Sequence, residues 1–149
     1  MFWTISLIKL KIFISSDHAG FILKNYIFQS LKKKKFKIVN LGPFNEKSVD
    51  YPIYAKKLAN KVSKNKTNFG ILICGSGTGM AMAANKVKNI RAAVCYNMKN
   101  TKLSRLHNNA NVITVGSRLT SKNLAFKLVN IFLKTKFEGG RHKKRIKKI

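Results

Sequence analysis

Acidic residues are scarce in this sequence, which has 4 Asp and Glu against 31 Lys and Arg in 149 residues, a formal net charge of +27. Such an excess is typical of proteins that bind nucleic acid or another polyanion. Here, however, 26 of the basic residues are lysine and only five are arginine. Lysine has A/T-rich codons, as do the abundant asparagine and isoleucine. We therefore attribute the charge to genome base composition and predict no specific nucleic-acid partner.

Cysteine and long apolar runs are equally sparse. Two cysteines, Cys74 and Cys95, are too few for a disulfide scaffold. No apolar run approaches the ~18 residues that a membrane-spanning helix needs. The N-terminal stretch MFWTISLIKLKIFI is interrupted by Lys9 and Lys11 and lacks a small-residue cleavage site, so it does not resemble a signal peptide. We expect a cytoplasmic protein with no membrane partner.

What the sequence does contain is a regular alternation of strand and helix patterns. Short β-branched and aromatic runs indicate buried strands, and apolar residues at helical spacing follow each of them. Connections of this length favour a parallel sheet with helices on both faces, an α/β three-layer αβα sandwich of Rossmann-like type in a single domain, 1–149. Strands are predicted over 10–15, 36–41, 69–74, 90–96 and 111–116, and helices over 21–33, 51–65, 80–87, 97–106 and 121–134.

Three of the predicted strands end in polar or reactive residues. The stretches 16–20 (SDHAG), 74–79 (CGSGTG) and 116–118 (GSR) follow the first, third and fifth strands. Ligands of parallel α/β sheets bind outside the carboxyl ends of the strands. We therefore expect one site at this edge. His107, which follows the fourth helix, is expected to face the same edge as Cys74.

The stretch CGSGTG matches none of three common phosphate-binding loops. It lacks the arginine of a phosphatase loop, the Lys-Ser/Thr of a P-loop and the third glycine of a dinucleotide fingerprint. What remains is a thiol, Cys74, facing several free backbone amides, which can stabilise an anion. A thiolate base beside such amides can abstract a proton next to a carbonyl group. A buried cysteine above an ordinary glycine turn is the equally compatible alternative.

The remaining charged residues are individually ambiguous. Asp17 lies at the predicted edge, whereas Asp50 is a candidate helix N-cap. Arg141 and Arg145 stand four apart, so on a helical turn they would share a face and could bind phosphate through their guanidinium forks. A disordered basic tail over 136–149 is the alternative for that segment.

Several motifs occur together in one order: SDHAGFILK, VDYPIYA, GILICGSGTGMAMAANK, IRAAVC, SRLHNNANV, GSR and EGGRH. In this combination, over 10–145, the sequence resembles the type B ribose-5-phosphate isomerases, a family that includes the galactose-6-phosphate isomerase subunits. The resemblance implies interconversion of ribose 5-phosphate and ribulose 5-phosphate through an enediolate, in the pentose phosphate pathway of carbohydrate metabolism. It also implies a homodimer or homotetramer with sites at the subunit interface, and neither metal nor cofactor.

The resemblance also assigns roles. Cys74 matches the base, His107 the acid that opens the furanose ring, Ser76 a hydroxyl near the substrate oxygens and Asp17 a sugar-binding carboxylate. The other matched residues bind the substrate: His18 and Asn108 the sugar, Gly75, Gly77, Thr78 and Gly79 the developing anion, and Arg118, Arg141 and Arg145 the phosphate.

The sequence departs from the family pattern in two ways, and two other functions are compatible with it. Residues 1–8 extend beyond the usual start, and the chain stops soon after Arg145, which bears on oligomer stability. One rival is isomerisation of galactose or allose 6-phosphate. The other is polyanion or RNA binding on the same fold. Cys74, Asp17 and His107 together argue for the enzyme, and a single chain that carries the whole set favours the pentose substrate.

Overall fold

The computed structural model of the protein describes residues 10–149, so the predicted extension over 1–8 lies outside the described residues. Five parallel strands form one sheet in the order β2-β1-β3-β5-β4. This confirms the predicted α/β class and parallel sheet. The strands are β1 (Lys11–Ser16), β2 (Lys37–Asn40), β3 (Asn68–Cys74), β4 (Ala92–Val94) and β5 (Val112–Gly116).

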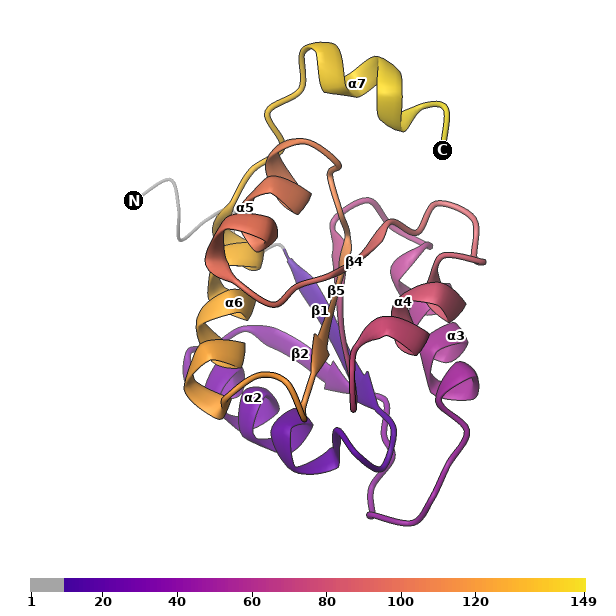
Figure 1. Cartoon of the computed structure of the whole chain (residues 1–149), viewed down its shortest axis with the longest axis vertical. Coiled ribbons are helices and arrows are strands. Elements are labelled where there is room, and N and C mark those ends of the chain that lie inside the picture. The colour runs from indigo at the N-terminus through magenta and orange to yellow at the C-terminus, as the bar shows by residue number, and fades with distance from the viewer. Residues whose placement is uncertain (1–9) are drawn as a thin grey trace.

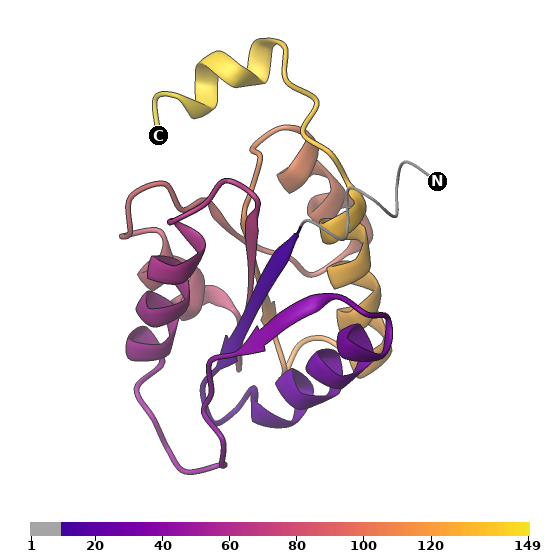
Figure 2. The same ribbon diagram turned by 180° about the vertical axis from the view of Figure 1, so that it is seen from behind.

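Helices cover both faces of the sheet (Figures 1 and 2). The layer of α2, α5 and α6 lies on one face, and α3 and α4 lie on the other. The short α7 lies in neither layer. It is at the end of the molecule opposite to the end towards which the strand arrows point, and its His142 ring stacks on that of His107. The bounds are α2 (Phe21–Lys33), α3 (Tyr51–Val62), α4 (Thr78–Ala84), α5 (Met98–Leu106), α6 (Lys122–Lys134) and α7 (Arg141–Ile146).

The central strand explains why two layers of helices are needed. Every residue of β3 is buried, because its near-continuous apolar sequence NFGILIC has side chains on both faces of the sheet. Ile71 and Ile73 belong to the core beneath α2 and α6, whereas Leu72 and Cys74 belong to the core beneath α3 and α4. The carboxyl end of β3, where Cys74 lies, is therefore packed between two hydrophobic cores.

Some predicted boundaries are wrong. The strand expected over 90–96 is only Ala92–Val94, because the backbone N–H of Arg91 bonds to the Asn111 side chain and Asn97 already caps α5. The helix expected over 51–65 ends at Val62, and the one expected over 80–87 begins at Thr78. Residues 141–146 form α7 rather than a disordered tail.

Helix α2 presents a different face to the core from the one its apolar residues suggest. Leu23, Lys24, Ile27 and Leu31 are buried, whereas Ile22 is 71% exposed. The tight turn at Gly20 sets the rotation of α2 about its own axis, and hence which residues face the core. A Cβ atom on Gly20 would lie 2.4 Å from the carbonyl oxygen of Ile73. Lys24 is therefore directed inward, towards the turn that follows β2.

Among residues 10–149, no helix combines the length and the apolar character that crossing a bilayer would require.

Candidate active site

A cavity of about 300 Å³ opens at the carboxyl edge of the sheet, beside β1 and β3. The chain leaves β1 towards β2 on one side and later enters β3 on the other, so the loops after β1 and β3 diverge at this point. Such a reversal of strand order is where parallel α/β sheets bind ligands. The lining residues are Asp17, Tyr51, Cys74, Gly75, Ser76, Gly79, Arg118 and Leu119.

Cys74 ends β3 with its thiol at the floor of this cavity. The backbone N–H of Gly77 donates a hydrogen bond to Cys74 Sγ, with a nitrogen–sulfur distance of 3.1 Å. Gly77 can turn its N–H in this direction because its φ of +79° is in the left-handed region, which glycine adopts without a steric penalty. The positive end of the Gly77 amide dipole therefore points at the sulfur atom. Cys74 thus makes a directed polar contact at the cavity in addition to packing in the core beneath α3 and α4.

The neighbouring loop from β5 brings Arg118 over the cysteine loop. Its backbone N–H donates to the carbonyl oxygen of Gly75 (3.0 Å), and that of Ser117 donates to the carbonyl oxygen of Cys74 (2.8 Å). A Cβ atom on Gly75 would lie 3.0 Å from Arg118 Nη1, so glycine here makes room for the guanidinium group. The loops therefore place a positive, hydrogen-bonding fork beside the thiol.

Asp17 and His18 enter from the loop after β1. Asp17 is 8% exposed, and its Oδ1 accepts a hydrogen bond from the backbone N–H of Gly20 (3.0 Å). His18 Nδ1 accepts from the backbone N–H of Val49 (3.2 Å), which ties the loop before α3 to this edge. The carboxylate is thus fixed in orientation at the cavity wall.

Two lining residues, Tyr51 and Leu119, were not predicted from the sequence as site residues. The Tyr51 ring covers Gly79 so closely that a Cβ atom there would lie 2.7 Å from two ring carbons. Tyr51 starts α3, and only the packing of α3 against α4 brings its ring to the cavity. Its presence in the VDYPIYA motif was the available signal in the sequence.

Four of the predicted site residues lie away from this cavity: His107, Asn108, Arg141 and Arg145. Helix α5 starts at the carboxyl edge after β4 and runs back, so His107 at its C-cap lies at the amino edge, just before β5 begins. The expectation that His107 faces the same edge as Cys74 is therefore wrong within one chain. The seven residues of β3, at ~3.3 Å each, put roughly 20 Å between the two edges. Figure 1 shows α7, which carries both arginines, at that far end.

At the amino edge the side chains of His107, Glu138 and His142 converge. The two imidazole rings stack with centroids 4.2 Å apart and planes inclined by 14°. Glu138 Oε2 lies 3.7 Å from His107 Nε2 and 3.9 Å from His142 Nε2. Burial first, and then the neighbouring charges of His107 and Arg141, lower the pKa of His142. These three residues are also the group best placed to hold a metal ion, because their ligand atoms all lie within 4.8 Å of one another.

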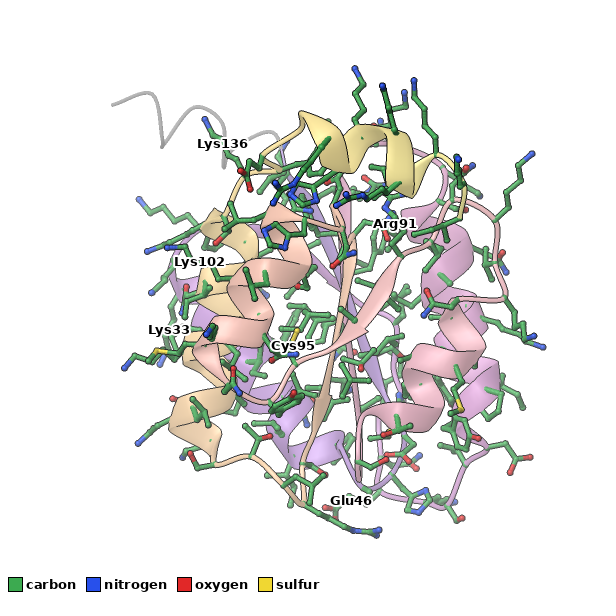
Figure 3. The ribbon with its side chains drawn as sticks, turned by 45° about the horizontal axis from the view of Figure 1, so that its top comes forward. Lys33, Glu46, Arg91, Cys95, Lys102 and Lys136 are labelled. Carbon is green, nitrogen blue, oxygen red and sulfur yellow. The ribbon has the colours of Figure 1, made fainter. Side chains whose placement is uncertain are left out.

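Arg105 gives this edge its rigidity. Its side chain is 6% exposed and donates to the carbonyl oxygens of Thr135 (3.0 Å) and Ala110 and to Asn109 Oδ1 (3.0 Å). Its guanidinium group also lies over the ring of Phe69, 4.8 Å from the ring centroid. Burial first, and then the charge of Arg91, lower the pKa of Arg105 to about 10. Arg105 therefore clamps the turn that carries His107 to the segment that leads to α7. Arg91, which donates to the carbonyl oxygen of Asn109, lies at the same end (Figure 3).

Comparisons with known proteins agree with the resemblance seen in the motifs. The family model for Ribose/Galactose Isomerase matches residues 12–149. A probable ribose-5-phosphate isomerase B of Mycoplasma genitalium is 49% identical over 140 residues, covering 93% of this chain and 92% of the relative. Ribose-5-phosphate isomerase B of Escherichia coli is 41% identical over 139 residues, covering 93% of each. The crystal structure of the M. genitalium ribose-5-phosphate isomerase B with bound ribulose-5-phosphate is similar at a TM-score of 0.90 and 48% identity, covering 93% of both chains.

Proposed function

This chain belongs to the ribose/galactose isomerase family, and on that premise we propose that it interconverts ribose 5-phosphate and ribulose 5-phosphate. The observation that carries the proposal is the Cys74 thiol, which accepts the Gly77 N–H at the floor of a cavity that Asp17 and Arg118 also line. A base, an anion-stabilising group and an acid are what an aldose–ketose isomerisation requires.

The proposed reaction moves one proton between adjacent carbons. The Cys74 thiolate takes the proton from C2 of the open-chain aldose, and the electron pair of that C–H bond forms the C1–C2 double bond of an enediolate. Backbone amides of 75–79 stabilise the negative oxygen together with the Ser76 hydroxyl, apart from those of Gly77 and Thr78, which donate to Cys74 Sγ and Ser76 Oγ. The thiol then returns the proton to C1, and the proton of the C2 hydroxyl passes to the C1 oxygen, so that C2 becomes the ketone carbon and C1 a hydroxymethyl group. Asp17 and His18 bind sugar hydroxyls and Arg118 binds phosphate, whereas Asn108, next to His107, binds a sugar hydroxyl in the site of a second copy of the chain.

We further propose that each site is completed by a second copy of the chain. Ring opening requires an acid, and the residues assigned to it and to phosphate binding, His107, Arg141 and Arg145, lie about one strand length from Cys74 in the same chain. In a symmetric dimer the amino edge of one protomer can meet the carboxyl edge of its partner, twice. The exposed apolar rim of the cavity supports such a contact, since Leu119 is 73% and Tyr51 is 41% exposed.

Two measurements test these proposals. The first compares ketose formation from ribose 5-phosphate with that from galactose and allose 6-phosphates at equal concentration. We expect the pentose phosphate to be strongly preferred. A preference for a hexose phosphate would replace the substrate assignment, and turnover of none of the three would remove the enzymatic one.

The second measurement is complementation. Cys74→Ala and His107→Ala chains, each expected to turn over ribose 5-phosphate far more slowly than the wild type, are unfolded together and refolded as a mixture. In a mixed dimer one site receives the intact Cys74 of one chain and the intact His107 of the other, so about a quarter of the wild-type activity should return. No recovery from a mixture shown to contain mixed dimers would mean that both residues act within one chain or not at all.

A further inference from the structure

We propose that His107, Glu138 and His142 bind a divalent transition-metal ion such as Zn²⁺, and that a metal bound there prevents His107 from acting as the acid that opens the sugar ring. The second half of this statement rests on the proposed function, whereas the first half does not. The three side chains come from the C-cap of α5, the segment before α7 and α7 itself, so the site forms only when α7 packs against the body.

The spacing of the ligand atoms fits a metal site. Tetrahedral zinc with bonds of ~2.0–2.1 Å separates neighbouring ligand atoms by roughly 3.4 Å. Glu138 Oε2 lies 3.7 Å and 3.9 Å from the two Nε2 atoms, and no pair exceeds 4.8 Å. The nearly parallel rings must tilt towards each other for both nitrogen lone pairs to meet one ion. The side chains of His107 and Glu138 are 37% and 58% exposed and have room for that adjustment.

His142 supplies an independent indication that a ligand belongs here. The side chain is 8% exposed, and its Nε2 is buried with no hydrogen-bond partner. A buried polar atom without a partner is destabilising, and a metal bond at this nitrogen would satisfy it.

The donor set is of a known chemical type. Two histidines and one carboxylate are a three-ligand set that zinc proteins use when a fourth position stays open. Arg141 and Arg145 oppose a dication through their charges, which also contribute to the lowered pKa of His142. The same arginines favour an anion, such as hydroxide or a phosphate oxygen, at the open position. We therefore expect reversible binding rather than a permanently held structural ion.

Binding is tested with Co²⁺ in phosphate-free buffer, on a chain carrying Cys74→Ala and Cys95→Ala so that no thiol competes. Tetrahedral Co²⁺ should give visible absorption that Zn²⁺ abolishes. Adding Glu138→Gln should weaken binding at least ~10-fold, by comparison with the effect of disturbing metal-ligand support. The matched control is Glu46→Gln, which removes an exposed carboxylate at the opposite end of the molecule (Figure 3). No absorption band, or equal weakening by both variants, would overturn the site.

The consequence for catalysis is tested by adding Zn²⁺ to the wild-type chain with two substrates. Ribose 5-phosphate needs its ring opened, whereas a four-carbon aldose phosphate is already open. Zn²⁺ should suppress turnover of the first much more than the second, a chelator should reverse the effect, and Glu138→Gln should blunt it. Equal suppression of both substrates, unaffected by Glu138→Gln, would place the inhibitory metal elsewhere. Failure of the metal-free enzyme to turn over either substrate would instead count against the proposed function and leave the Co²⁺ result standing.

Discussion

Burying the Lys24 ammonium group has an energetic cost, and replacing Lys24 by methionine tests that cost. The side chain is fully buried in α2, and its ammonium group donates to Asn40 Oδ1 (3.1 Å) and to the carbonyl oxygen of Pro43. It lies over the rings of Phe21 and Phe44. Burial lowers the pKa of Lys24 from 10.5 to about 8. The ammonium therefore holds the turn after β2 at an energetic cost.

The sign of the pH dependence follows from linkage. The unfolded chain binds the Lys24 proton more tightly than the folded chain, so the free energy of unfolding rises with pH between about 8 and 10.5. Below pH 8 the full cost is present, at ~1.4 kcal/mol per pKa unit, or about 3 kcal/mol. Raising the pH from 7 to 9.5 should relieve about 2 kcal/mol of it.

At pH 7, Lys24→Met should change stability little, because two effects oppose each other. The variant loses the buried charge, which stabilises it by about 3 kcal/mol. It also leaves the Pro43 carbonyl without the Lys24 donor, which costs about 1–3 kcal/mol. Asn40 Oδ1 keeps its second donor, the backbone N–H of Gly42 (2.9 Å). The pH dependence of the difference in free energy of unfolding between the two chains is thus more informative than its value at one pH.

The assay is urea unfolding of both chains at pH 7 and pH 9.5, at equal protein concentration. The wild type should gain about 2 kcal/mol relative to Lys24→Met across this interval. The control is Lys33→Met, an exposed residue of the last turn of the same helix, for which the difference from wild type should not change with pH. A Lys24 difference that stays constant between the two pH values would refute the buried, pKa-lowered ammonium.

Three further predictions concern the proposed site. Cys74→Ala should reduce kcat on the order of 10²–10⁴-fold with folding retained, whereas Cys95→Ala, a buried packing residue, should change kcat little; similar effects of the two would contradict the thiol assignment. His107→Ala should slow turnover of ribose 5-phosphate more than that of an open-chain four-carbon aldose phosphate, and equal losses would argue against an acid that opens the ring. Arg141→Lys keeps the charge but loses the planar fork, so KM should rise by an amount equivalent to roughly 1–3 kcal/mol, measured at low and physiological salt. Lys144→Ala, on the same short helix, should act weakly and only at low salt; an effect as large as that of Arg141→Lys would indicate a diffuse basic surface.

Much of the fold was predictable because its determinants are local in the sequence. The apolar runs of β1, β3 and β5 and the helical spacing in α2 and α6 fix each element before any of them meet. A parallel sheet then brings the loops after its strands to one edge, so Asp17, Cys74 and Arg118 could be assigned to one site from the sequence alone. The stretch CGSGTG alone left two interpretations open, a reactive thiol beside free amides and a buried cysteine above a glycine turn.

Only the tertiary structure decided the features that depend on direction and packing. A helix that returns across the sheet takes His107 to the edge opposite Cys74, and sequence order does not reveal this because both residues follow regular elements. Tyr51 reaches the cavity through the packing of α3 on α4, and Lys24 is buried because the turn at Gly20 rotates α2. The stacking of His142 on His107 joins segments 35 residues apart. In each case a contact between distant segments overrides what the residue type suggests, because burial and orientation are set by the assembled layers rather than by neighbouring residues.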